Sequence, residues 1–108
     1  MSVPSENENW LIETGDAIIR KKAAQGALRL TSPERLIYCL WVADYGMRNA
    51  GDLETAKDVY ADFQEEAKRL SAELRLPFTH ETFSLPKDSL ERQYLARFER
   101  MCDEIRKA

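Results

Sequence analysis

Hydrophobic residues between Leu53 and Leu74 recur at alternating steps of three and four positions. This spacing keeps their side chains on one face of an α-helix. Acidic residues dominate the opposite face. The apolar stripe consists of Leu53, Ala56, Tyr60, Phe63, Ala67, Leu70 and Leu74. The pattern therefore predicts one long amphipathic helix over residues 53–75.

Glycine and proline residues separate this helix from three other periodic segments. The four expected helices span residues 6–25, 33–50, 53–75 and 88–107. Ser5 and Glu8 have the spacing of a capping box at the start of the first helix. Ser32 is the expected N-cap of the second helix, because Pro33 then takes the first helical position, where its missing N–H is not needed.

The connection over residues 76–87 is too apolar for a free linker, since it contains Phe78, Phe83 and Leu85. We expect it to fold back over one end of the helices, with a short helical turn near residues 79–83. No segment alternates as a β-strand would. The sequence therefore predicts an all-α fold, a compact four-helix bundle-like arrangement in a single domain over residues 1–108, which is long enough to bury one core.

The charge balance is mild, with 16 basic and 19 acidic residues and a net charge of -3. It gives no reason to expect nucleic acid or a membrane as a partner. The longest apolar run, residues 36–43, is far shorter than the roughly 20 residues that span a bilayer. The first residues lack the basic and apolar regions of a signal peptide. We therefore expect a cytoplasmic protein, in which Cys39 and Cys102 stay reduced.

Residues that could carry catalysis or hold a metal are sparse. The single histidine, His80, has no cysteine near it in the sequence, whereas a zinc site needs three or four ligands. The Glu-x-x-His spacing of helical di-iron sites is absent, as are a P-loop, a dinucleotide-binding fingerprint and a nucleophile elbow. We therefore expect no enzyme activity, no metal and no cofactor.

An acidic stripe on the outer face of the 53–75 helix is the first candidate binding surface. It consists of Glu54, Asp58, Asp62 and Glu65. Such a row could bind a basic protein partner, but the acids also lie in the half of the helix where its dipole favours negative charge. The recognition helix of a helix-turn-helix motif enters the DNA groove with its N-terminal end. Here that end is acidic and would repel duplex DNA, which excludes such a motif.

Two other surfaces are candidates. Tyr38, Trp41 and Tyr45 share a face of the second helix and form either core or the wall of a small-molecule pocket. The first helix carries a second apolar stripe, which either packs inside the domain or buries against a second copy in a homodimer. That stripe consists of Ile12, Ile19 and Ala23.

The segment from Leu30 to Asp52 resembles the helix and Asn-Gly-Gly turn of the DNA-mimic-protein family of small all-helical bacterial proteins. Asn49 and Gly51 match the turn, whereas Ala50 and Asp52 depart from the family pattern. The resemblance implies an all-α fold, a dimer, and a partner-binding role through acidic surface.

The leading functional hypothesis from the sequence is a non-catalytic protein–protein interaction module of the immunity or inhibitor kind, which binds a partner through the acidic face. The alternatives are a small-molecule-binding or regulatory domain with an aromatic pocket, and a self-associating domain. Each alternative uses one of the candidate surfaces, so the arrangement of those surfaces in space decides between them.

Overall fold

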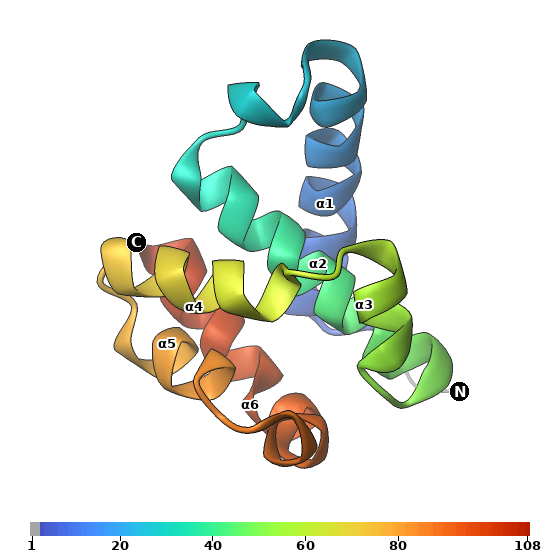
Figure 1. The fold of residues 1–108 in the computed structure, drawn as a ribbon, viewed down its shortest axis with the longest axis vertical. Coiled ribbons are helices and arrows are strands. Elements are labelled where there is room, and N and C mark those ends of the chain that lie inside the picture. The colour runs from blue at the N-terminus through green and yellow to red at the C-terminus, as the bar shows by residue number, and fades with distance from the viewer. Residues whose placement is uncertain (1–2) are drawn as a thin grey trace.

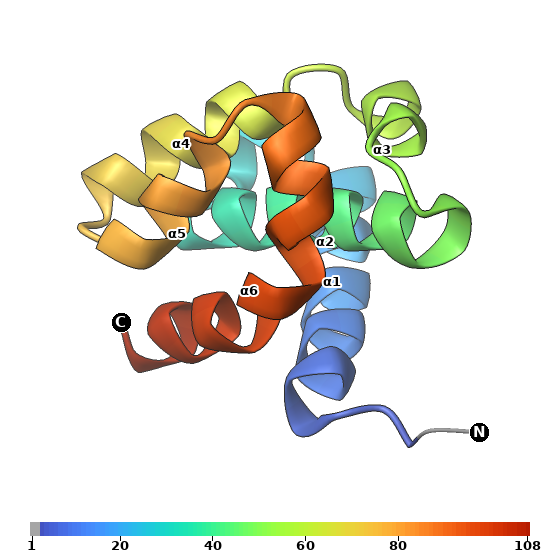
Figure 2. The same cartoon turned by 90° about the horizontal axis from the view of Figure 1, so that it is seen from below.

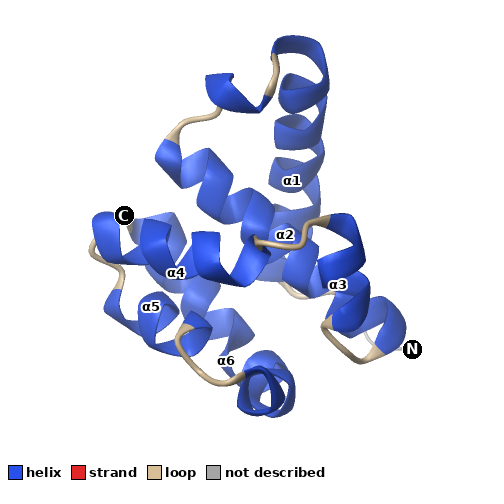
Figure 3. Cartoon of the chain, viewed as in Figure 1, coloured by secondary structure: helices blue, strands red, loops and turns tan. Residues whose placement is uncertain are grey.

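The computed structural model describes residues 3–108, and within that range every regular element is helical (Figure 1, Figure 3). The all-α prediction is confirmed. The elements are α1 (Glu6–Gln25), the 3₁₀ turn η1 (Ala27–Arg29), α2 (Ser32–Ala50), α3 (Glu54–Val59), α4 (Phe63–Glu73), α5 (Pro77–Phe83) and α6 (Lys87–Lys107). The described residues thus form six α-helices, where the sequence predicted four.

Local capping explains where α2 begins, and it corrects one prediction. The N-cap is Thr31, not Ser32. Thr31 and Glu34 form a capping box, in which the Thr31 hydroxyl accepts from the Glu34 N–H and the Glu34 carboxylate accepts from the Thr31 N–H. Ser32 could not form such a box, because the residue three positions later is Arg35, which has no acceptor.

The single helix predicted over residues 53–75 is wrong, because the chain leaves the helical conformation between α3 and α4. Tyr60 has extended backbone angles, with φ -151° and ψ 101°. The break does not change which side of the segment is buried, because the apolar stripe faces the core both before and after Tyr60. The fully buried members of the stripe are Leu53, Ala56, Phe63, Ala67 and Leu70.

Packing against α2 is the physical reason for the break. α3 lies very close to the C-terminal half of α2, where a Cβ atom on Gly46 would lie 2.9 Å from the backbone nitrogen of Ala56. α4 instead contacts the N-terminal half of α2, where Glu66 forms an ion pair with Arg35. One straight helix cannot follow both contacts, and tertiary packing overrides the local helical preference.

The predicted apolar loop over residues 76–87 is largely the helix α5, so the expected helical turn is present and longer than predicted. Its first N–H groups have a remote cap. The Glu104 carboxylate of α6 accepts hydrogen bonds from the backbone N–H groups of Phe78 at 2.9 Å and Thr79 at 2.8 Å. At the other end, the Gln64 side chain donates to the carbonyl of Phe83. The segment is therefore fixed to both of its neighbouring helices.

α2 runs through the middle of the molecule, with α1, α3 and α4 around it (Figure 2). It has more buried residues than any other helix of the described chain. The bulkiest core side chains are Tyr94, Phe63, Phe83 and Phe98, which come from α4, α5 and α6. The core is thus assembled around α2 from both halves of the chain.

A polar cluster extends from this core to the surface. Asp44 is 9% exposed and accepts a hydrogen bond from the hydroxyl of Tyr94 and another from Nε of Arg48. Arg48 also lies 3.0 Å from the carboxylate of Glu8 in α1. Asp44 is covered by α6 through Tyr94, whereas Arg48 is exposed. The cluster links α1, α2 and α6.

Candidate functional site

α1 and α3 both lie against α2 (Figure 1). Side chains of these three helices line a groove of about 430 Å³. Its lining residues are Ile19, Lys22, Ala23, Tyr38, Trp41 and Val59. We call this groove the aromatic groove. It unites two surfaces that the sequence presented separately, the aromatic stripe of α2 and the second apolar stripe of α1.

The rings of α2 form a stacked row along the groove. The ring centroids of Tyr38 and Trp41 are 6.3 Å apart and their planes differ by 11°, while Trp41 and Tyr45 are 5.5 Å apart with planes differing by 19°. Trp41 also rests on Gly15 of α1, where an added Cβ atom would lie only 2.4 Å from its Cδ1. The predicted aromatic candidates are therefore held together by one another and by α1.

The aliphatic candidates differ in their surroundings. Ile19 and Ala23 line the aromatic groove, whereas Ile12 is 51% exposed and lies outside its lining. Val59, which the sequence did not single out, completes the groove from α3 and is 43% exposed. Tyr45 continues the row of rings and is 42% exposed. The site is thus an open apolar surface built by three helices.

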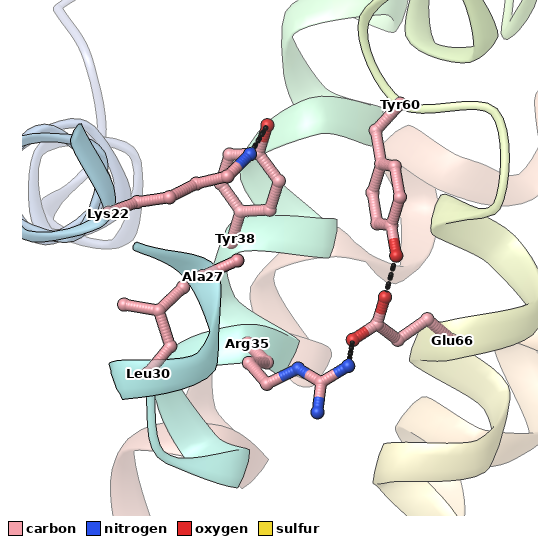
Figure 4. A pocket seen from close by; sticks show the side chains of 7 residues that line it. All are labelled: Lys22, Ala27, Leu30, Arg35, Tyr38, Tyr60 and Glu66. Carbon is pink, nitrogen blue, oxygen red and sulfur yellow. Dashed lines mark hydrogen bonds and ion pairs between the residues drawn. The ribbon is translucent and has the colours of Figure 1, made fainter. Parts of the chain in front are cut away.

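A smaller cavity of about 110 Å³ adjoins the groove (Figure 4). Its lining residues are Lys22, Ala27, Leu30, Arg35, Tyr38, Tyr60 and Glu66. We call it the Lys22 cavity. Lys22 and Tyr38 line both the cavity and the groove, and Nζ of Lys22 donates to the Tyr38 hydroxyl at 3.3 Å. This pair therefore stands between the two spaces.

Polar side chains line the side of the Lys22 cavity opposite Lys22. They come from α2, from α4 and from Tyr60, which lies between α3 and α4. The Glu66 carboxylate accepts a hydrogen bond from the Tyr60 hydroxyl and forms an ion pair with Arg35 (Figure 4). The hydrogen bond to Glu66 raises the pKa of Tyr60. This grouping was not predicted, because Arg35 comes from another helix and helical spacing placed Tyr60 in the apolar stripe.

The acidic stripe does not form one helix face. Glu54 and Asp58 lie on α3, Asp62 precedes α4 and Glu65 lies within α4, so the break at Tyr60 divides the set. Glu54 forms an ion pair with Lys87. The other three are exposed, and none of them forms an ion pair within residues 3–108.

The remaining reactive side chains are not assembled with one another. Nδ1 of His80 lies 3.0 Å from the backbone carbonyl of Lys68. Cys39 and Cys102 are buried free thiols, and burial raises the pKa of each to about 12. Over residues 3–108 no group of three or more metal-ligating side chains comes together.

Within the same range, none of the helices has the length and apolar character needed to cross a membrane. Comparison with the profiles of known protein families, with curated proteins and with solved structures found no match.

Proposed function

We propose that this protein is a non-catalytic binding module that takes a helix of a partner protein into the aromatic groove. The observation that carries the proposal is the convergence of apolar side chains from α1, α2 and α3 on one open surface. Exposed apolar surface of this kind typically marks an interaction site, and tryptophan and tyrosine are the residues most often responsible for binding energy at interfaces.

The groove is already shaped for binding. Trp41 is fixed between Gly15 on one side and the stacked rings of Tyr38 and Tyr45 along α2. A surface whose side chains are held in place loses less conformational entropy when a partner binds. Apolar grooves between helices commonly bind the apolar stripe of an amphipathic helix. The aromatic groove, lined by α1, α2 and α3, is of this kind.

Charge indicates what else the partner helix should carry. Lys22 lies at the edge of the groove and forms no ion pair within residues 3–108. An acidic side chain beside the partner's apolar stripe would pair with this ammonium group and fix the register of the helix. The proposed partner segment is therefore apolar on one face and has a carboxylate at the margin of that face.

Site-specific photo-crosslinking in the native host tests the proposal. A benzophenone amino acid replaces Ala23 or Val59 at the groove, and Leu95 on α6 serves as the control position. The control is matched, because Leu95 is 54% exposed and Val59 is 43% exposed. We expect the same crosslinked partner from Ala23 and Val59 and none from Leu95.

A second substitution makes the result specific to the groove. Ile19→Glu places a charge in the groove lining and should abolish the crosslink from Val59, while Leu95→Glu should leave it unchanged. Equal crosslinking from all three benzophenone positions would overturn the proposal, as would a Val59 crosslink that survives Ile19→Glu in a folded protein. A crosslink between two copies of the chain would identify a homodimer as the occupant.

The acidic set is the second candidate surface, because Asp58, Asp62 and Glu65 remain exposed and free of ion pairs within residues 3–108. It fits a basic partner, an immunity or inhibitor role, and the acidic binding surface that the resemblance to DNA-mimic proteins implies. Reversal of all three acids to lysine separates the candidates. Loss of the crosslinked partner in this variant, with the partner retained in Ile19→Glu, would favour the acidic surface over the groove.

A further inference from the structure

We infer that the Lys22 cavity binds a small carboxylic acid with a short aliphatic tail, whose carboxylate contacts Lys22 and Tyr38. This site shares Lys22 and Tyr38 with the aromatic groove, but the inference is argued from the cavity alone and does not depend on the proposed protein-binding function. The inference comes from three features of the cavity: its unused hydrogen-bond donors, its excess positive charge and its apolar wall.

The donors meet at one corner of the cavity (Figure 4). The Tyr38 hydroxyl accepts a hydrogen bond from Lys22, which leaves its own hydrogen available. The ammonium group of Lys22 has three donors, and Tyr38 is its one side-chain acceptor within residues 3–108. A carboxylate has two oxygens, so it can accept from the ammonium group and from the hydroxyl at the same time.

Charge in the cavity also favours an anion. Two cationic side chains, Lys22 and Arg35, line it together with one carboxylate, that of Glu66. Glu66 is already engaged by Arg35 and by the Tyr60 hydroxyl. No carboxylate in the cavity lining therefore balances the charge of Lys22, whose ammonium group lies 4.4 Å from the centroid of the Tyr38 ring. A ligand of opposite charge would supply that balance.

Size and wall chemistry restrict the rest of the ligand. The volume is about 110 Å³, somewhat less than the roughly 150 Å³ of an engineered cavity that holds benzene. Ala27 and Leu30 supply the wall on the side of η1. An acid the size of butanoate matches both properties, because its propyl group would contact these two side chains while its carboxylate reaches Lys22.

Titration of the full chain with butanoate tests the inference by NMR, read from the methyl groups of Ala27 and Leu30. Butan-1-ol and butylammonium keep the tail and replace the carboxylate by a neutral or a positive group. We expect a saturable shift of both methyl signals with butanoate, at least tenfold weaker binding of the two analogues, and no shift at Leu95. The expected factor corresponds to loss of a hydrogen bond to a charged group.

Three variants assign the carboxylate contact. Lys22→Gln and Tyr38→Phe should each weaken butanoate binding, by roughly tenfold for the charged donor. Lys21→Gln is the control, since Lys21 is the neighbouring cation and pairs with Glu34 outside the cavity lining. Absence of a saturable shift, equal binding of butylammonium, or an equal effect of Lys21→Gln would overturn the inference. Because each readout uses a defined acid, failure here leaves the crosslinking test of the aromatic groove unaffected.

Discussion

The hydroxyl of Tyr94 lies 2.7 Å from Oδ1 of Asp44, and this hydrogen bond joins α6 to α2 inside the core. Tyr94 has no exposed surface. Burial and the adjacent carboxylate of Asp44 raise the pKa of Tyr94 well above its ordinary value, so the phenol keeps its proton and acts as the donor. The contact fixes how the C-terminal helix meets the central one.

Tyr94→Phe should lower the free energy of unfolding by about 1–3 kcal/mol, because it removes a donor from a carboxylate that is mostly shielded from water. The ring volume is almost unchanged, so a cavity contributes little to the effect. Denaturant unfolding measures the difference. Tyr45→Phe is the matched control, since Tyr45 is 42% exposed, and it should change stability by less than about 0.5 kcal/mol. Equal effects of the two substitutions would contradict the role of the buried contact.

Gly15→Ala should destabilise the protein by about 1–3 kcal/mol. In an open helix the same change stabilises by about 0.5–1 kcal/mol, but here the new methyl group would lie 2.4 Å from Trp41 and force the indole outward. Ala24→Gly, at an exposed position of the same helix, measures the helix preference alone. In a Trp10→Phe background, the emission of Trp41 should shift to longer wavelength in Gly15→Ala. An increase in stability would show that Trp41 does not rest on this glycine.

Arg75→Gly should stabilise the protein by about 1 kcal/mol, because Arg75 has a left-handed backbone, with φ 58°, which is costly for a residue with a side chain. It ends α4 in a Schellman motif, in which the N–H of Leu76 bonds to the carbonyl of Ser71 and that of Arg75 to Ala72. Thermal unfolding tests the gain. Ala72→Gly, inside the same helix, should instead lose about 1 kcal/mol, and a loss in both variants would be inconsistent with this motif.

The N-terminal cap of α1 should make stability depend on pH. The hydrogen bond from the Ser5 N–H and the charge of Arg48 lower the pKa of Glu8 below its ordinary value of 4.5. The stabilisation from ionised Glu8 is therefore complete above pH 4.5 and is lost as the pH falls through the lowered pKa of the folded state. The stability difference between wild type and Glu8→Gln should be larger at pH 7 than at pH 3. An identical difference at both pH values would contradict the assignment.

The parts of the fold that the sequence predicted well are those fixed by local interactions. α1 begins after its predicted capping box, in which Ser5 and Glu8 bond reciprocally. α2 ends at Ala50, as predicted, and is followed by Gly51, whose positive φ is suited to a helix C-terminus. Asp52 accepts hydrogen bonds from the N–H groups of Glu54 and Thr55 at the start of α3. Each of these features is determined within a few residues along the chain.

The errors arise where distant residues decide local structure. Nothing in the sequence between Tyr60 and Asp62 interrupts a helix, and the break follows from the close approach of Ala56 to Gly46. α5 was predicted mainly as a loop, because its cap is the side chain of Glu104, which comes from the last helix. The spacing of apolar residues within one segment carries no information about contacts with residues far away in the sequence.

The candidate site likewise has parts that the sequence predicted and parts that it did not. The stripe containing Trp41 and the stripe containing Ile19 were both found from helical spacing, since each lies on one helix. Their meeting in one groove depends on α1 packing against α2 through Gly15, which the sequence did not predict. The Lys22 cavity was missed altogether, because its lining residues, among them Lys22 of α1 and Glu66 of α4, come together only in the folded chain.

The central claim is that the aromatic groove is the binding surface, and the methyl NMR spectrum of the chain in complex with its crosslinked partner tests it most directly. The signals of Ile19, Ala23 and Val59 should shift on addition of the partner, while that of Leu95 on α6 should stay in place. Shifts confined to residues outside the groove, with Ile19 and Ala23 unchanged at saturating partner, would contradict the account.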